Sequence, residues 1–451
     1  MGNGASCQSF AASLSLSFHH HPSVGTGLIE EKITIVRHVP VQFYQRKEIT
    51  DDNIQEMAAE AGLGKLGWWD FLVHTELCTM NYDCLSMAED DRLVHAIRMM
   101  ENFQVPQALK KNASDLVPLI YDVQQIMRAN SYHNFCHVID VTQYMYTLLL
   151  ATRVAQKLAP VEVAAAFIGA LCHDLDHPGL SNAYQNSTKS PLSQKYDADS
   201  PLERHHLSEF ERLAAKHELL DNLNETQQAR FRDVVQHMIL ATDMSKHGML
   251  MRKIADKLSA PEYNPLHSAD GVNLVLQIGL KCADISNQAR PWKVANRWND
   301  AVYTEFYHEG DLDRAAGRDV APLYDRNANQ IPKSTAGFIH YLVAPLYEVY
   351  VAIMKRCASM DGSIDSRAVE ECLVFLHKNK ARYQLLADGE HVDRDEDEEE
   401  LLTFAEDLRG SVDVNARPAL PGVNGEQQRD TRKQFLRAIK MAKHPPEIRA
   451  V

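Results

Sequence analysis

No segment of this 451-residue chain comes close to an uninterrupted apolar run that could span a membrane as a helix. The most apolar stretch, 337–354, is interrupted by His340, Pro345 and Glu348, so we expect a buried core helix there. The chain also has no excess of positive charge, because 61 Asp and Glu outnumber 47 Lys and Arg and the formal net charge is −14. Nucleic-acid binding needs clustered Lys and Arg, so we exclude nucleic acid as the main partner. A small anionic substrate stays open, since bound metal ions would dominate the local field.

The sequence contains no C-x-x-C pair and no ordered cysteine framework. Its eight cysteines are scattered, and several lie in apolar helical stretches. This distribution is typical of free thiols in a reducing compartment. A secretory signal is disfavoured because no basic segment precedes the apolar stretch 10–18. We therefore predict a cytoplasmic protein.

The first seven residues, MGNGASC, fit the pattern for N-myristoylation of Gly2, with Ser6 in the preferred position. Cys7 could accept palmitate, which would supply the second anchor that stable membrane residence requires. We expect peripheral attachment to the cytosolic face of a membrane. An ordinary unstructured start of the chain is the alternative.

Strand-like alternation is absent from the body of the chain, and helical spacing replaces it. Apolar residues recur at i, i+3 and i+4 through most of the sequence between 114 and 386. The segments are 114–128, 141–158, 161–171, 226–241, 272–283, 297–307, 338–354 and 368–386. We predict an all-α domain over 54–390. A flexible segment, 1–53, precedes it, and an acidic linker with a flexible tail, 391–451, follows it.

The stretch 171–179, LCHDLDHPG, places two histidines and two aspartates within five positions directly after an apolar run. Ionisable groups at the end of a buried helix need compensation, because unpaired charge away from water is costly. A divalent ion supplies it if His173 and Asp174 bind one ion. His177 returns to the face of His173 and can support the ligands or bind a second ion. For an isolated His-Asp pair, a plain hydrogen bond at the helix end is the alternative.

Further polar clusters at the ends of apolar segments favour metal. His133 and His137 have the i, i+4 spacing at which two imidazoles converge. Glu203 lies in the cluster ERHH, which opens another helical segment, and Asp284 follows the apolar run 272–280. Such clusters are unlikely to recur by chance, so we interpret them as parts of one metal site.

The combined donor set predicts a metal-dependent phosphohydrolase. Two imidazoles and two carboxylates, from His137, His173, Asp174 and Asp284, suit zinc or a comparable first-row ion. Asp174 can bridge to a harder ion that is completed mostly by water, as magnesium or manganese prefers. Two such ions would hold a hydroxide between them for in-line attack on phosphorus. His133 would then be free to act as the general acid.

Several motifs, in order, resemble those of the class I cyclic nucleotide phosphodiesterases across about 63–386. They are YHN at 132–134 with His137, HDxDHxG at 173–179 with Asn182, SxLExHH at 200–206, ILATD at 239–243, DISN at 284–287, EFYxxGD at 305–311 and GFI at 337–339. The resemblance implies a compact multi-helix bundle of the HD type with a binuclear metal site. It also implies two divalent ions, Zn²⁺ and Mg²⁺, with Mn²⁺ as an alternative. The implied reaction is hydrolysis of cAMP, cGMP or both to the 5′-monophosphate.

The resemblance further implies a role for each matching residue. Metal ligands would be His137, His173, Asp174 and Asp284, and His133 would protonate the O3′ leaving group. Residues that orient the metal-bound waters and the acid would be His177, Glu203, Thr242 and Asp243. The nucleotide would meet Tyr132, Asn287, Val302, Thr335 and Phe338, and the last of these would clamp the purine against Val302.

One departure from the family concerns the purine edge. Two residues before Gly337 the family carries a glutamine whose amide pairs with the purine, whereas this chain has Thr335. A hydroxyl cannot supply the bidentate pair that an amide can. We therefore expect weaker purine binding or relaxed selectivity, at about 0.5–1.5 kcal/mol for one lost hydrogen bond. Gln330 is a nearby candidate substitute. Glu309 also replaces a usual glutamine, with no role evident from the sequence.

Two alternatives to this function remain. The chain could be an HD-type phosphohydrolase of another nucleotide, although the ordered motifs count against that. It could also be a non-catalytic homologue that binds nucleotide or scaffolds a partner. Thr335 is the only feature that supports this second alternative, because the metal ligands are all present.

Overall fold

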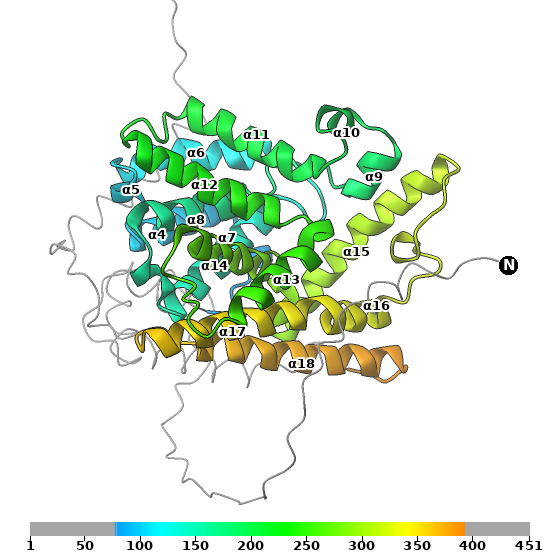
Figure 1. Ribbon diagram of the computed structural model, residues 1–451. Helices are drawn as coiled ribbons and strands as arrows, with labels where there is room; N and C mark the ends of the chain where they lie inside the picture. Colours follow the sequence, from blue (N-terminus) through cyan, green and yellow to red (C-terminus); the bar gives the residue numbers. More distant parts are fainter. Residues whose placement is uncertain (1–76, 78, 393–451) are drawn as a thin grey trace, which may run out of the picture. The chain divides into compact units, whose positions relative to one another are not determined.

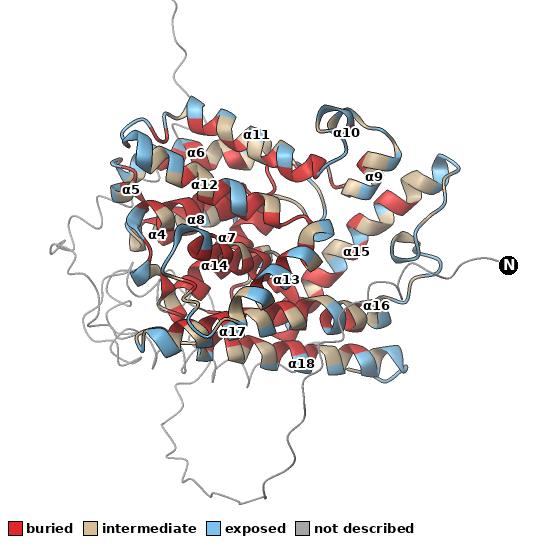
Figure 2. Ribbon diagram, viewed as in Figure 1, coloured by how far each residue is buried: buried red, intermediate tan, exposed pale blue. Residues whose placement is uncertain are grey.

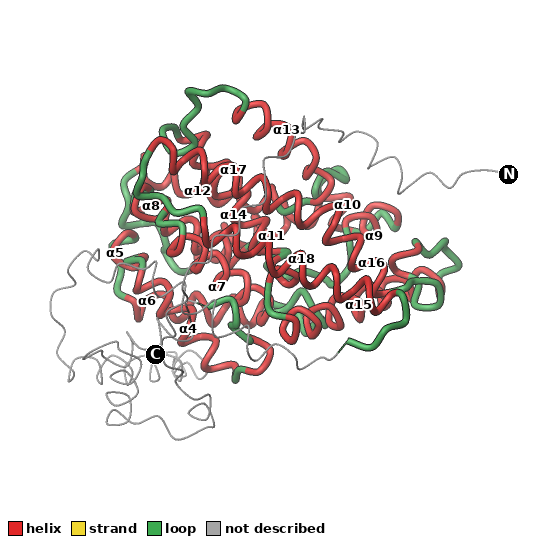
Figure 3. Tube along the Cα trace, turned by 90° about the horizontal axis from the view of Figure 1, so that it is seen from below, coloured by secondary structure: helices red, strands yellow, loops and turns green. Residues whose placement is uncertain are grey.

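The residues that the computed structural model describes, 77 and 79–392, form helices joined by short connections, with no strand among them (Figures 1 and 3). They all belong to the unit Trp69–Val451. The predicted all-α class is confirmed. The acylation sites predicted at Gly2 and Cys7, the acidic run 393–400 and the tail lie outside the described residues. The last described helix ends at Ala387, and the predicted domain boundaries stay predictions.

Four helices form the centre of the fold: α7 (Phe135–Ala151), α8 (Pro160–Cys172), α12 (Glu225–Ala241) and α14 (Ala269–Asp284). α8 packs on α7 and α12, and α14 packs on the same two helices. Every residue of α8 after Glu162 is buried, and so is nearly all of α7 (Figure 2). A helix that is apolar on all sides is stable only when neighbours surround it. These helices therefore carry the hydrophobic core.

The other helices bury part of their surface, against the four central helices or against one another, and expose the rest (Figure 2). They are α4 (Glu89–Asn102), α5 (Val105–Ala108), α6 (Ala113–Ile126), α9 (Asn182–Ser187), α10 (Pro191–Lys195), α11 (Pro201–Lys216), α13 (His247–Leu258), α15 (Trp292–Ala315), α16 (Ile331–Phe338), α17 (Ala344–Met360) and α18 (Arg367–Ala387). Short 3-10 turns are η3 (Cys84–Ser86), η4 (Val154–Lys157), η5 (Met244–Lys246), η6 (Ser286–Ala289) and η7 (Pro322–Tyr324).

α16 and α17 are joined by a π-helical turn, η8 (Ile339–Val343), into one long apolar helix. Pro345 explains the wider turn, because its ring nitrogen cannot donate the hydrogen bond that would continue a regular helix. By length and composition, Ile331–Met360 could cross a membrane, but half of its most apolar window is buried inside the fold. It packs on α13, α14 and α18 as a core helix does.

Several predicted helices have other bounds in the structure: the segment 297–307 is part of α15, 338–354 lies within 331–360, and α7 is displaced along the chain. The apolar pattern suggested 141–158, whereas α7 begins at Phe135 and ends at Ala151. The helix begins early because the Asn134 side chain accepts a hydrogen bond from the His137 amide, at 3.2 Å, and caps the first turn. The first turns carry His137 and the buried Asp140, polar residues that hide the helical pattern.

The ends of these helices converge on one place. His173 caps the C-terminus of α8, Thr242 caps that of α12, and Asp284 is the last residue of α14. The C-terminal end of a helix carries partial negative charge, which favours a cation. The core therefore directs three negative helix ends toward the residues that the sequence singled out.

Candidate metal centre and acid

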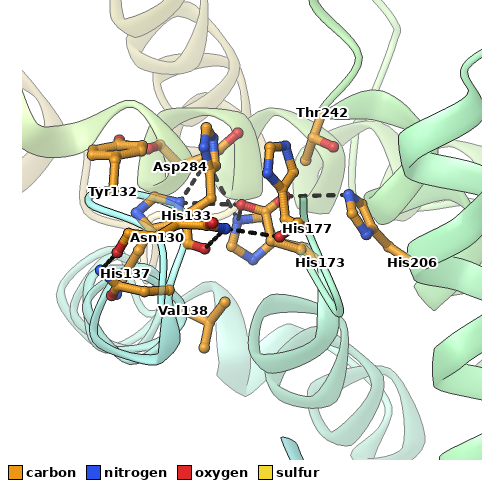
Figure 4. Close-up of polar contacts among 12 residues, drawn as sticks. Asn130, Tyr132, His133, His137, Val138, His173, His177, His206, Thr242 and Asp284 are labelled. Atoms are coloured by element: carbon orange, nitrogen blue, oxygen red, sulfur yellow. Dashed lines mark hydrogen bonds and ion pairs between the residues drawn. The ribbon is translucent and has the colours of Figure 1, made fainter. Parts of the chain in front are cut away.

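Four buried or nearly buried side chains meet at the ends of α7, α8 and α14 (Figure 4). His137 Nε2 lies 3.4 Å from Asp174 Oδ2 and 3.3 Å from Asp284 Oδ1. His173 Nε2 lies 3.3 Å and 3.4 Å from the same two oxygens. Ligands that bind one ion at about 2.0–2.2 Å lie roughly 3–3.5 Å from their neighbours. The spacing fits a single divalent ion.

The hydrogen bond made by His173 Nδ1 directs the other ring nitrogen, Nε2, at the position of the metal. Nδ1 lies 2.8 Å from the carbonyl oxygen of Ala170 and donates its proton there. In the neutral ring Nε2 carries the lone pair that a metal ion binds, and, like Asp174 Oδ2, it is buried without a hydrogen-bond partner. Leaving a buried polar atom unpaired costs about 1–3 kcal/mol. A cation between the two atoms would satisfy both.

Without an ion, the two carboxylates act on the two imidazoles instead. Burial alone would lower the pKa of His137, but Asp174 and Asp284 outweigh it and raise that pKa. The same balance raises the pKa of His173 well above its usual value. Burial would raise the pKa of Asp174, yet the histidines hold it well below its usual range. An incoming ion must therefore displace protons from these imidazoles.

The proposed acid, His133, lies in the loop before α7, and a carboxylate from α15 holds it. His133 Nδ1 pairs with Glu305 Oε1. Glu305 Oε2 accepts from the backbone amides of Tyr132, at 2.9 Å, and of His133, at 3.1 Å. Burial would raise the pKa of Glu305, but these hydrogen bonds, with that of the His133 ring first, lower it. The His133 side chain is 23% exposed, so the nitrogen that does not face Glu305 is left for a ligand.

Three histidine rings form a row beside the metal centre (Figure 4). His133 stacks on His177 with centroids 3.9 Å apart, and His177 stacks on His206 at 5.5 Å. Donor atoms of His133, His177 and Glu305 lie within 4.8 Å of one another. An imidazole lone pair lies in the plane of its ring, so stacked rings do not direct their nitrogens at one ion. His177 Nδ1 instead accepts from the Gly179 amide at 3.0 Å.

A carboxylate-rich group adjoins the metal ligands. Both carboxylate oxygens of Glu203 accept from Asn182 Nδ2, at 3.1 and 2.9 Å. Burial raises the pKa of Glu203 to about 7, opposed by Asn182 and reinforced by Asp243. Asp243 accepts from the Ser200 hydroxyl at 2.6 Å. The Thr242 hydroxyl donates to a carbonyl of α12 at 2.8 Å. The roles predicted for these residues toward metal-bound water stay predictions.

Of the residues predicted to meet the nucleotide, two adjoin the metal ligands. The Tyr132 ring lies 4.5 Å from that of His137, and its hydroxyl donates to the Asp284 carbonyl at 3.4 Å. The same hydroxyl accepts from Asn287 Nδ2 at 2.5 Å. Tyr132 and Asn287 thus line the side of the metal centre next to α14.

The other three residues predicted to meet the nucleotide, Val302, Thr335 and Phe338, lie on α15 and α16. Val302 and Phe338 are partly exposed, whereas Thr335 is buried. Thr335 Oγ1 donates to Asn299 Oδ1 at 3.0 Å and lies 3.3 Å from the Tyr303 hydroxyl. Among the described residues, no hydrogen bond, ion pair or ring contact joins these three to the metal ligands. Their role at the purine stays a prediction.

Sequence reasoning left several site residues without a role. Glu305, Asn182 and His206 stood in the quoted motifs, but no spacing in the sequence connects them to the groups that they contact. His206 donates from Nδ1 to the Leu175 carbonyl at 2.6 Å and fixes the metal-bearing loop. Glu309 now has a structural role, because it accepts from the amide and the hydroxyl of Ser181, at 2.6 and 2.8 Å.

Comparison with known proteins identifies the family of this chain. The family model for 3′5′-cyclic nucleotide phosphodiesterase matches residues 132–363. The chain is 30% identical over 352 residues to the 3′,5′-cyclic-nucleotide phosphodiesterase regA of Dictyostelium discoideum, covering 77% of this chain and 42% of that protein. It is 31% identical to the 3′,5′-cyclic-AMP phosphodiesterase 4C of Rattus norvegicus, covering 65% and 53%. The human high affinity cGMP-specific 3′,5′-cyclic phosphodiesterase 9A is 30% identical, covering 57% and 42%.

Solved structures show the same fold. The phosphodiesterase domain of the RhoPDE fusion protein from the choanoflagellate Salpingoeca rosetta aligns with a TM-score of 0.65 at 24% identity, covering 71% of this chain and 98% of that one. LmjPDEB1 in complex with IBMX aligns with a TM-score of 0.64 at 24% identity, covering 70% and 93%. This chain spans only about two fifths to half of the curated relatives named above. Since the family model covers half of the chain, the chain belongs to the 3′,5′-cyclic nucleotide phosphodiesterase family.

Proposed function

We propose that this chain hydrolyses 3′,5′-cyclic nucleotides, either cAMP, cGMP or both, to the 5′-nucleoside monophosphates. The observation that carries the proposal is the convergence of His137, His173, Asp174 and Asp284 beside a partly exposed histidine that a carboxylate orients. The names of the relatives, which include cAMP-directed and cGMP-directed phosphodiesterases, support the substrate class.

Family membership implies divalent metal ions, and the four side chains could hold one. We assign Zn²⁺ to this set, because two imidazoles and two carboxylates suit a borderline-soft ion. We assign the second position, which would share Asp174, to Mg²⁺ or Mn²⁺, because carboxylates and water suit harder ions. When bound, the two ions would activate water and neutralise charge on the phosphoryl oxygens.

The residues of the chain supply the rest of the reaction. The bond from phosphorus to O3′ breaks as the oxygen of water bonds to phosphorus. His133 gives a proton to the departing O3′ from the nitrogen that does not face Glu305. Glu305 holds the other ring nitrogen, and the stack on His177 holds the plane of the ring. The purine would lie between Val302 and Phe338, away from the reacting phosphorus.

Base recognition would differ from the usual family pattern. The Thr335 hydroxyl is buried and already donates to Asn299, so it is not offered to a ligand. We therefore propose relaxed discrimination between adenine and guanine. The family match and the complete donor set disfavour both a different nucleotide substrate and a non-catalytic role.

We also propose that the chain is cytoplasmic and attached to the cytosolic face of a membrane. The support is the N-terminal sequence pattern at Gly2 and Cys7 and the scattered cysteines. Labelling of cells with an alkynyl myristate analogue tests it. We expect incorporation into the parent and none into Gly2→Ala, and an unlabelled parent would contradict the proposal.

Steady-state hydrolysis of cAMP and cGMP by the full chain, with zinc and magnesium supplied, tests the main proposal. We expect cleavage of both nucleotides and release of the 5′-monophosphate. A protein that retains stoichiometric zinc but cleaves neither nucleotide would contradict the substrate assignment while leaving the metal centre in place.

A further inference from the structure

The loop that carries two of the metal ligands contains a strained residue. Asp176, two positions after Asp174, has a φ of 57°. This left-handed conformation is unfavourable for residues with a side chain, although Asp tolerates it better than most. The chain closes a turn here, because the His177 amide donates to the Asp174 carbonyl at 3.1 Å. Contacts from outside the turn would offset the cost of this conformation at Asp176.

An arginine from another part of the chain contacts Asp176 with both arms of its guanidinium. Arg128 lies between α6 and α7. Its Nε donates to Asp176 Oδ1 at 2.7 Å, and a terminal nitrogen donates to Oδ2 at 3.1 Å. His205 Nε2 lies 2.8 Å from the same Oδ2. Two parallel hydrogen bonds fix the carboxylate in orientation as well as in position.

Asn130, two residues after Arg128, joins the same two segments a second time. Its Nδ2 donates to the carbonyl oxygens of His133 and His177, both at 2.8 Å (Figure 4). Gly179 permits this approach, since a Cβ there would lie 2.8 Å from Asn130 Oδ1. The segment 128–133 therefore links the loop of the acid histidine to the loop of the metal ligands.

We propose that Arg128 is a positioning residue, which fixes the metal-bearing loop by holding Asp176 in its left-handed conformation. Through the adjoining Asn130, it also keeps His133 in place relative to the metal ligands. The effect on the metal follows from the donor set alone, whereas the effect on the acid rests on the proposed function. The mere presence of an exposed ion pair would not justify this, because most such pairs contribute little.

The chain offers a matched control for this proposal. Arg326 makes a comparable two-armed pair with Asp311, at 3.1 and 2.5 Å, and its side chain is 48% exposed, as is that of Arg128. Asp311 lies on α15 and is no neighbour in sequence of a metal ligand. The two arginines therefore differ in what their carboxylate partner supports.

The test measures zinc affinity of the full chain by competition with a coloured chelator, on the parent, Arg128→Met, Arg128→Lys and Arg326→Met. We expect Arg128→Met to weaken zinc binding about tenfold, the lower end of the range for residues that support metal ligands indirectly. Arg128→Lys keeps the charge but not the two parallel donors of the guanidinium, so it should lose less zinc affinity than Arg128→Met. Arg326→Met should bind as the parent does. Equal affinities in Arg128→Met and Arg326→Met would overturn the proposal.

A second set of variants, made in Asp176→Gly, tests whether Arg128 acts through the strained conformation of Asp176. Glycine adopts positive φ without penalty, so Asp176→Gly removes both the strain and the partner of Arg128. We expect Arg128→Met to change zinc affinity no further in Asp176→Gly, and a full additional tenfold loss there would overturn the proposal. Hydrolysis is measured separately on the parent. A parent that is inactive but shows the zinc effect contradicts the proposed function and leaves the role of Arg128 intact.

Discussion

The metal side and the base side of the site are built differently. On the metal side, buried atoms of His173 and Asp174 have no hydrogen-bond partner, and a metal ion would satisfy both. On the base side, the Thr335 hydroxyl is already paired with Asn299 inside the fold. A region that is incomplete without its ligand tolerates few substitutions, whereas a region that satisfies itself can change residue types. The motif residues at the metal ligands are all present, whereas Thr335, which is predicted to meet the purine, departs from the family pattern. A second departure, Glu309, holds Ser181.

Removal of one metal ligand should have the largest effect. We expect Asp284→Ala to lower zinc affinity more than about 100-fold, beyond the range for indirect supports, and to reduce hydrolysis to background. Asp270→Ala at the opposite end of α14 is the control, because Asp270 is exposed and pairs with Lys253 and Lys257. Zinc content and hydrolysis check both. Substantial activity in Asp284→Ala would show that the four-residue set is not the metal centre.

Removal of the proposed general acid, His133, should lower the rate of hydrolysis without changing the zinc content. We expect His133→Ala to lower kcat for cyclic nucleotides by about 10²–10⁴-fold, with zinc content unchanged. The loss should shrink strongly with a p-nitrophenyl phosphodiester, whose leaving group needs no proton. Glu305→Gln should show the same dependence on the leaving group, less strongly. An equal loss with both substrates would mean that His133 has another role.

Zinc binding should weaken as the pH falls, whereas binding of the purine should not. The pKa values of His137 and His173 are raised in the absence of an ion, so these imidazoles hold protons that zinc must displace. Below the raised pKa values, each displaced proton lowers the apparent affinity about tenfold per pH unit. Calorimetry in two buffers of different ionisation enthalpy measures the protons released. Zinc binding without proton release would contradict this account.

Substitution on the base side should have the smallest effect. We expect Thr335→Gln to change KM for one or both nucleotides by about two- to tenfold, as one gained hydrogen bond allows, with kcat nearly constant. The matched variant Thr335→Val removes the hydroxyl and keeps the shape, and it should leave the ratio of kcat/KM for cAMP and cGMP close to that of the parent. A large fall in kcat in Thr335→Val would mean that the two sides are coupled.

The helical class, the metal-binding set and the acid could be predicted because each depends on short-range pattern. His137 lies in the first turn of α7 and Asp284 is the last residue of α14, so both positions reflect helix geometry. His133 lies in the loop before α7 and is recognised by the motif around it. The partners could not be predicted, because they come from distant parts of the chain. Glu305 is 172 residues from His133, and no spacing rule connects them.

Buried polar groups also hid the start of one helix. The start of α7 was missed because His137 and Asp140 interrupt its apolar pattern. Asp140 is fully buried and pairs with the fully buried Arg290 at 3.0 Å. From the sequence alone, these two charged residues would be predicted to lie on the surface. The tertiary structure alone shows that it lies in the core, where removal of one partner would strand the other charge.

The unpaired atoms of His173 and Asp174 also bear on how long the folded protein survives. An ion that binds only the folded chain raises the free energy of unfolding by mass action, by about 2.7 kcal/mol when its free concentration is one hundred times the dissociation constant. Domains are stable by only about 5–15 kcal/mol, so this is a substantial share. Zinc supply would therefore shift the melting temperature and the resistance to proteolysis of this chain, and a chelator should lower both in addition to stopping hydrolysis.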